Sequence, residues 1–118
     1  MLGDYLSARS IYIACGHTDM RKSIDGLAAL VQQDFKLDPF QKALFLFSGR
    51  SRDRLKALMW EGDGFVLLYK RLEDGRFKWP KDEKEARQIT RQQFRWLLEG
   101  LAIEQPQAVK KVHPETCL

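Results

Sequence analysis

Cysteine and long apolar runs are both scarce in this sequence. Its 118 residues include two cysteines, Cys15 and Cys117, which are too few for a disulfide framework, so we expect a reduced, cytoplasmic protein. No stretch approaches the roughly 18 consecutive apolar residues that a membrane-spanning helix needs. The first residues lack a cationic start followed by an apolar run. We therefore expect no signal peptide and no membrane partner.

The sequence is also poor in groups that hold metals or perform catalysis. The residues that could be proposed as metal ligands are Cys15, His17, His113 and Cys117. Their spacing does not match the common zinc-binding patterns. A metal-dependent nuclease needs clustered carboxylates, and Asp63 and Asp74 are better explained as turn residues. We predict no metal, no cofactor and no catalytic residue; a nuclease that acts through Asp53 is the rival hypothesis.

Hydrophobic residues make up 44% of the chain and aromatic residues 11%, which is enough for one hydrophobic core. We predict a single domain over residues 1–103 and a flexible tail over residues 104–118, because the tail is polar and has no periodicity. The net charge is +4. The whole excess lies between residues 50 and 81, where nine Lys and Arg face five Asp and Glu. A local basic cluster favours a polyanionic partner such as nucleic acid.

The hydrophobic pattern predicts an α+β fold with a mostly antiparallel sheet. Strands are expected at residues 10–15 and 42–48, with one helix between them that Thr18 or Asp19 caps. Two Asp-Gly pairs predict a three-strand meander, with strands at 54–62, 65–73 and 76–79. Residues 80–87 form a charged linker. A C-terminal helix begins at Thr90, which has capping-box spacing to Gln93.

Two-residue turns centred on the Asp-Gly pairs determine the predicted register of the meander. In that register Lys56 lies opposite Arg71, and Arg71 lies opposite Lys78. The three cations then form one row across neighbouring strands, which is unfavourable for stability unless an anion binds there. The opposite face carries Leu55 and Phe77 among its apolar residues and is predicted to be the core.

The predicted nucleic-acid surface combines this row with the preceding polar loop. Its residues are Arg50, Arg52, Arg54, Lys56, Arg71, Arg76 and Lys78. An ordinary solvated face, or a different register, is the alternative for the same pattern. The apolar residues Leu58, Trp60 and Tyr69, with Leu67, form a predicted protein contact patch on this face. Stacking on bases is a further role for Trp60 and Tyr69, whereas a core position is the commoner one for aromatic residues in strands.

Three motifs resemble one known family. They are ACGHTDMRKSIDGLAALV, LFLFSGRSRDRLKALMWEGDGFVLLYKRLEDGRFKWP and a closing helix that ends in LLEGL, and they span residues 10–103. Together they are similar to the small TnpB-type accessory proteins of bacterial insertion sequences of the insertion-sequence 66 family, which are distinct from the RNA-guided nuclease of the same short name. Ser23 departs from that family, where glycine is expected.

The resemblance implies a non-catalytic protein that acts in transposition with a separately encoded transposase. The motifs fall on residues 18–22, on Arg52, Asp53, Arg54 and Lys56, and on Lys70, Arg71, Arg76, Phe77, Trp79 and Pro80. The expected partners are the transposase, other proteins of the element and the DNA of the element's ends. A protein-interaction module that assembles or regulates the transposase without touching DNA is the alternative function.

Overall fold

The computed structural model describes residues 8–82 and 84–106 of the chain. Its elements are β1 (Ser10–Ala14), α1 (Ile24–Gln33), β2 (Ala43–Ser48), β3 (Arg54–Trp60), β4 (Phe65–Arg71), β5 (Ala86–Ile89) and α2 (Arg91–Leu98). The five strands form one sheet in the order β4-β3-β2-β1-β5. Strands β1 and β2 are parallel, and the other three neighbouring pairs are antiparallel. The predicted α+β class with a mostly antiparallel sheet is therefore confirmed.

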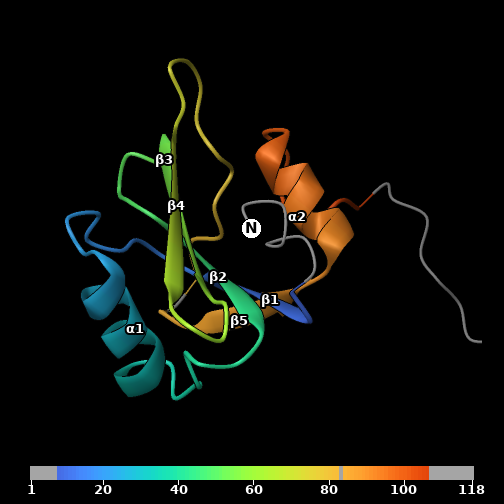
Figure 1. The fold of residues 1–118 in the computed structure, drawn as a ribbon. Coiled ribbons are helices and arrows are strands. Elements are labelled where there is room, and N and C mark those ends of the chain that lie inside the picture. The colour runs from blue at the N-terminus through green and yellow to red at the C-terminus, as the bar shows by residue number, and fades with distance from the viewer. Residues whose placement is uncertain (1–7, 83, 107–118) are drawn as a thin grey trace, which may run out of the picture.

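The central strands are apolar on both faces because a helix covers each face (Figure 1). Side chains alternate along a strand. Leu44 and Leu46 of β2 therefore lie in the cluster that contains α2, while Phe45 and Phe47 lie in the cluster that contains α1. All four side chains are buried. The sheet is thus the middle layer of the molecule, and only its edges and the loops at its two ends are accessible.

The two helices begin differently. Helix α2 has the predicted capping box, in which the Thr90 side chain accepts from the Gln93 N–H and the Gln93 side chain accepts from the Thr90 N–H. The predicted cap of α1 is wrong, because that helix starts later, after Ser23. The Asp19 carboxylate accepts from Arg21 instead, and the buried Thr18 donates its N–H to the Ser48 carbonyl.

The predicted register of the first hairpin is wrong by two residues. The turn is centred on Gly62 and Asp63, and it is closed by the N–H of Glu61, which donates to the carbonyl oxygen of Gly64 at 2.9 Å. Gly62 has a positive φ of 93°, whereas Asp63 does not have the positive φ that a type I′ turn at Asp63-Gly64 would need. A shift of two residues keeps every side chain on its predicted face and changes only its cross-strand neighbour.

The predicted strand at residues 76–79 is not a strand in the structure. Gly75 has a positive φ of 82° in the turn that reverses the chain. The chain then crosses to the α2 face, where the Phe77 N–H donates to the Arg52 carbonyl and the Trp79 Nε1–H donates to the Ala14 carbonyl, at 2.7 and 2.8 Å. The structure does contain a three-strand meander, but it begins one strand earlier than predicted and consists of β2, β3 and β4.

The charged segment that was predicted as a linker contains the fifth strand. β5 pairs antiparallel with β1, with Ile13 opposite Arg87 and Ile11 opposite Ile89. Ile89 is buried, while the Arg87 guanidinium pairs with the carboxylates of Asp82 and Glu104. This edge strand was not predicted because its segment is rich in charged residues. It carries them because only one of its two faces packs on the core.

The described chain continues past α2. The Gln93 side chain donates to the carbonyl oxygen of Ile103 at 3.1 Å, and Ile103 is buried. Most of the predicted tail, residues 107–118, lies outside the described residues. Neither helix of the described part is long and apolar enough to cross a membrane.

Candidate nucleic-acid interface

The sheet topology brings three separate segments to one end of the molecule. β1 and β2 are parallel, so residues 15–23 and the loop 49–53 follow them at the same end. β3 begins there, β4 ends there, and β5 begins there, because each pairs antiparallel with its neighbour. We call the described residues of the segments 15–23, 49–54 and 71–85, without residue 83, the basic end. They contain ten Lys and Arg and six Asp and Glu.

Arg52 holds the loop of the basic end together. It has a positive φ of 64°, its N–H donates to the carbonyl oxygen of Gly49, and its own carbonyl accepts from Phe77. Its Nη1 donates to the carbonyl oxygen of Gly16 at 3.2 Å. Arg52 therefore joins the three segments, and its guanidinium is already engaged with the backbone.

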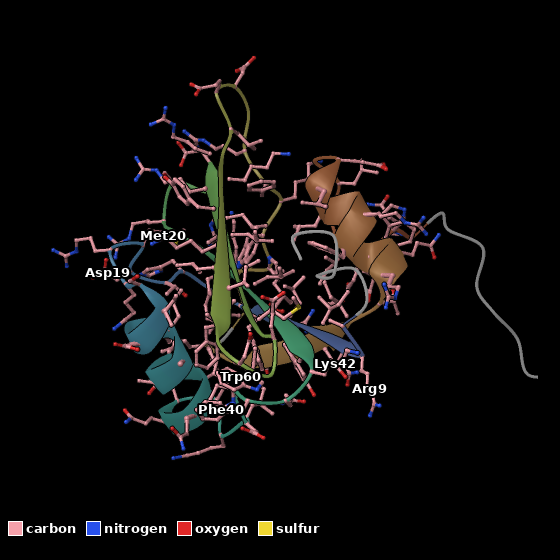
Figure 2. All side chains as sticks on the ribbon, in the orientation of Figure 1. Arg9, Asp19, Met20, Phe40, Lys42 and Trp60 are labelled. Atoms are coloured by element: carbon pink, nitrogen blue, oxygen red, sulfur yellow. The ribbon has the colours of Figure 1, made fainter. Side chains whose placement is uncertain are left out.

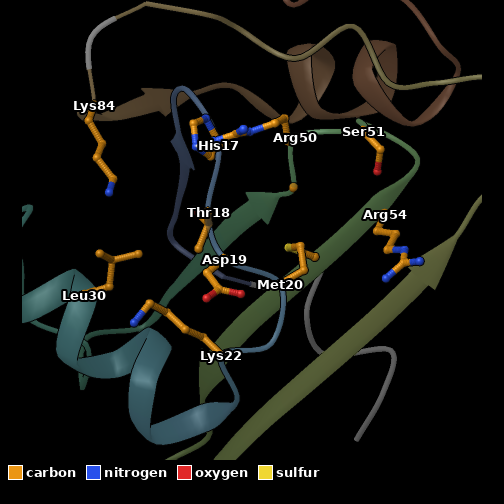
Figure 3. Close-up of a pocket in the computed structure, with 11 residues that line it drawn as sticks. His17, Thr18, Asp19, Met20, Lys22, Leu30, Arg50, Ser51, Arg54 and Lys84 are labelled. Carbon is orange, nitrogen blue, oxygen red and sulfur yellow. Dashed lines mark hydrogen bonds between the residues drawn. The ribbon is translucent and has the colours of Figure 1, made fainter.

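Arg50 lines a cavity of about 570 Å³ between the loop after β1, the loop after β2 and α1 (Figure 3). Its Nη2 lies 3.2 Å from His17 Nε2. Lys22, Arg54 and Lys84 also line this cavity, and among the described residues that line it Asp19 is the one with a carboxylate. Lys22 belongs to the motif at residues 18–22 on which the family resemblance rests, but it was not among the predicted nucleic-acid residues. Lys84 was not predicted, because its segment was expected to be a linker. The cavity is therefore cationic.

The carboxylate of Asp19 is already hydrogen-bonded to Arg21. Asp19 accepts from Arg21 Nε and Nη2 and from the Arg21 backbone N–H. These hydrogen bonds, first that of the side chain, hold the pKa of Asp19 far below its ordinary value. Asp19 thus remains ionised and paired with Arg21, and it offers no proton to a ligand at neutral pH.

Arg54 and Arg71 lie opposite each other on β3 and β4, so two like charges face each other across the strands. Each has an acidic neighbour: Arg54 Nε is 3.8 Å from Asp53 Oδ1, and Arg71 Nη2 is 3.2 Å from Glu73 Oε1. Asp53 also accepts from the Ser51 hydroxyl, which is the main reason that its pKa is lowered. Local carboxylates therefore offset part of this positive charge.

Arg76 and Lys78 follow the second turn and line another cavity, of about 460 Å³, with Arg52, Lys81 and Trp79. Both are exposed. Neither they nor Arg50 form an ion pair with a carboxylate within the described part of the chain. These three side chains are the members of the predicted set that are best placed to meet an external anion.

Lys56 is not part of a cationic row. It lies opposite Tyr69, and Lys78 is not on a neighbouring strand, so the row of Lys56, Arg71 and Lys78 is wrong. Its Nζ donates to the carbonyl oxygens of Met20 and Lys22, at 2.8 Å each, and lies 5.7 Å from the centre of the Tyr69 ring. Lys56 therefore connects the sheet to the loop before α1.

Of the apolar candidates, Leu58 and Trp60 lie toward the opposite end of β3, whereas Tyr69 lies near the end of β4, close to the basic end. Leu58 has no exposed surface, because α1 covers it, so it cannot belong to a contact patch. Trp60 is half-buried, and its ring packs on Phe65 and Phe40, with centroids 4.9 and 5.0 Å apart. Figure 2 shows Phe40 and Trp60 together, far from Asp19 and Met20 of the basic end.

Phe40, which is 53% exposed, was not among the residues predicted from the sequence. It follows Pro39 in a connection between a helix and a strand, where no periodic pattern marks it. Tyr69 is also 53% exposed. The exposed aromatic surface therefore differs from the predicted patch: Leu58 leaves it, and Phe40 and Phe65 join Trp60.

The described residues, 8–82 and 84–106, contain no group of three or more His, Cys, Asp and Glu side chains that could hold an ion. Cys15 is buried, and burial raises the pKa of its thiol. His113 and Cys117 lie outside the described residues. Asp53, the residue of the nuclease hypothesis, is engaged with Ser51 and Arg54.

Known proteins resemble this chain over most of its length. A family model described as "IS66 Orf2 like protein" matches residues 9–108. The y4hO protein of Sinorhizobium fredii (strain NBRC 101917 / NGR234) is 44% identical over 97 residues, which are 82% of this chain and 84% of the relative. The y4jC protein of the same strain is 34% identical over 91 residues, 77% and 78% of the two chains. No solved structure matches the chain. The chain therefore belongs to the IS66 Orf2-like family and is an accessory protein of an insertion sequence.

Proposed function

We propose that this accessory protein binds the DNA of the element's ends through its basic end and acts there with a separately encoded transposase. One observation carries the proposal. Arg50, Arg76 and Lys78 come from two segments far apart in the sequence and reach the same end of the sheet, where no described carboxylate pairs with them. Cations that are exposed and unpaired attract phosphate groups, and the release of counterions from DNA favours their binding.

The acids of the basic end offset only part of its positive charge, because they are fewer than its Lys and Arg residues. Asp19 is held by Arg21 and Glu73 by Arg71, while Asp82 pairs with Arg87. Arg52 and Lys56 act differently from the other candidates, because their charged groups donate to backbone carbonyls. Arg52 positions the loop that carries Arg50 and the segment that follows Arg76, whereas Lys56 positions the loop before α1. The proposed phosphate contacts belong to the exposed side chains.

The experiment is a salt titration of binding to labelled element ends and to random DNA of equal length. Because each phosphate contact contributes about 0.9 to the slope of log K against log salt, an Arg76→Ala/Lys78→Ala variant should lower the slope by about 1.8. The matched control is Arg9→Ala/Lys42→Ala. It removes the same charge from two exposed residues at the start of β1 and just before β2, at the other end of the sheet (Figure 2).

The outcomes separate a local surface from a general charge effect. Equal losses in the two double variants would show that only net charge matters and would contradict a DNA site at the basic end. Wild-type protein without any salt-dependent binding would contradict DNA binding itself. A higher affinity for element ends than for random DNA would show that bases or DNA shape are recognised as well.

A second candidate function is contact with the transposase without DNA, and the exposed Phe40 ring beside Trp60 and Phe65 favours it. Exposed aromatic clusters are typical of protein contacts. The test is co-purification of the transposase after nuclease treatment. Retention that depends on Phe40, as judged by a Phe40→Ser variant, would support this function, and loss of the complex with nuclease would support a DNA bridge.

A further inference from the structure

Strand β4 leaves one edge of the sheet open. It pairs only with β3, and no segment of the described chain pairs with its outer edge. The Leu72 N–H donates to the Asp53 carbonyl, and the Gly64 carbonyl accepts from Glu61, so the even-numbered residues of β4 bond toward β3. The backbone N–H and C=O groups of Phe65, Leu67, Tyr69 and Arg71 must therefore point outward.

These outward groups match a second copy of the same strand in one antiparallel register. When Leu68 lies opposite Leu68 of the second copy, Phe65 faces Arg71 and Leu67 faces Tyr69. Every one of the four outward residues then meets another outward residue, and the hydrogen-bonding groups of Phe65–Arg71 are all satisfied. A shift of two residues would leave the outward groups of one terminal residue unpaired in each strand, Arg71 or Phe65.

The charged residues of β4 lie at its end. Lys70 and Arg71 are its last two residues, Glu73 and Asp74 follow them, and Arg71 Nη2 lies 3.2 Å from Glu73 Oε1. In the antiparallel register Lys70 faces Val66 and Arg71 faces Phe65 of the second copy, so no cation faces a cation, whereas parallel in-register pairing would place like charges together. Arg71 would also reach the ring cluster of Phe65, Trp60 and Phe40, and guanidinium groups bind favourably on aromatic rings.

Charged residues on an edge strand commonly prevent such pairing. In β4 they occupy only the last two positions, and residues 65–69 are uncharged. We propose that the protein forms a symmetric dimer in which β4 pairs antiparallel with β4 of a second copy, with Leu68 beside the two-fold axis. The two basic ends would then lie at opposite ends of a continuous ten-stranded sheet.

A proline substitution tests the edge without disturbing the fold. Tyr69→Pro removes an outward N–H from an exposed position, which an edge strand tolerates. We expect wild-type protein to sediment as a dimer and Tyr69→Pro to weaken that dimer by about tenfold or more, because each copy loses a hydrogen bond. Tyr69→Thr keeps the N–H and should remain dimeric. Circular dichroism checks that each variant is folded.

A cysteine substitution tests the register independently. Opposite residues of a non-hydrogen-bonded antiparallel pair have Cα atoms about 4.5 Å apart, within the range of a disulfide. Leu68→Cys in a Cys117→Ser background should therefore form a covalent dimer on mild oxidation. Val66→Cys faces Lys70 of the second copy and lies about 13 Å from its own counterpart, so it should remain uncrosslinked.

Several results would overturn the dimer. Wild-type protein that sediments as a monomer would do so, whether the edge is vacant or receives a strand of another protein. A dimer that Tyr69→Pro leaves intact, or one in which Val66→Cys crosslinks and Leu68→Cys does not, would also overturn it. If Tyr69→Pro fails to fold, the crosslinking result decides. None of these measurements uses DNA, so they are independent of the proposed function.

Discussion

The ammonium group of Lys56 lies 2.8 Å from the carbonyl oxygen of Met20 and joins β3 to the loop that precedes α1. The same Nζ also donates to the carbonyl oxygen of Lys22. Two backbone carbonyls that would otherwise need water are thus satisfied by one half-buried cation. A lysine in the middle of a basic segment therefore has a structural role.

Replacement of Lys56 by Met should destabilise the protein by about 2 kcal/mol, because hydrogen bonds from a charged donor are lost and the apolar stem is kept. Urea unfolding measures this change. Lys42→Met is the matched control, since Lys42 is exposed, and it should change the free energy of unfolding by less than about 0.5 kcal/mol. Equal effects of the two substitutions would contradict the structural role.

Thr90→Ala should cost about 1 kcal/mol, because it removes the side-chain oxygen that accepts from the Gln93 N–H at 3.1 Å. α2 covers one face of the sheet, so weakening its start lowers the stability of the whole domain. Thermal or urea unfolding is the measurement. Gln92→Ala, an exposed position in the same helix, should be nearly neutral; a comparable loss there would point to helix propensity in place of the cap.

Trp79→Phe should destabilise the domain by about 1–3 kcal/mol, since the buried carbonyl of Ala14 loses its donor, the Trp79 Nε1–H. The smaller ring adds a packing defect on the α2 face. Trp96→Phe, at a half-buried position in α2, provides the comparison. Unfolding monitored by circular dichroism should show the larger loss for Trp79→Phe, and the reverse order would argue against this contact.

The ion pair of Asp19 and Arg21 should make the free energy of unfolding depend on pH in the acid range. The pKa of Asp19 is below its ordinary value of 3.8, so the folded state binds a proton less tightly than the unfolded state. The pair therefore stabilises the protein above pH 3.8, and this stabilisation is lost as the pH falls below that value. Asp19→Asn should be less stable than wild type at neutral pH, and the difference should shrink in acid.

A series of urea unfolding curves from pH 7 into acid tests this dependence. Asp63→Asn is the control, because it removes one negative charge from an exposed turn residue. Asp63 forms no ion pair within the described residues, so its replacement removes a charge without removing a pair. If the two variants show the same pH dependence, the acid effect comes from net charge, and Asp19 has no special part in it.

Features that depend on a few neighbouring residues could be predicted from the sequence. Thr90 and Gln93 identify the start of α2 because both hydrogen bonds of a capping box form within one turn. The apolar run of β2 identifies a central strand because both of its faces must be covered. The faces of β3 were also assigned correctly, since alternation survives a shift of two residues.

Other features depended on contacts that the local sequence does not specify. The stretch Glu61-Gly-Asp-Gly64 permits a turn at Gly62-Asp63 as well as at Asp63-Gly64. In the observed register Trp60 lies opposite Phe65 and Leu58 opposite Leu67, which places large apolar side chains together under α1. Similarly, residues 76–79 have a strand-like pattern, but Phe77 and Trp79 are buried on the α2 face, where Trp79 Nε1–H donates to the Ala14 carbonyl.

The sequence by itself determined the α+β class, the two helices, the faces of the central strands and the position of the basic residues along the chain. These properties follow from side-chain periodicity, capping and charge, which are local. Only the tertiary structure decided which cations are exposed. The charged groups of Lys56 and Arg52 donate to backbone carbonyls, whereas Arg50, Arg76 and Lys78 are exposed. The difference arises because carbonyl groups from distant segments bind some of the charged side chains and not others.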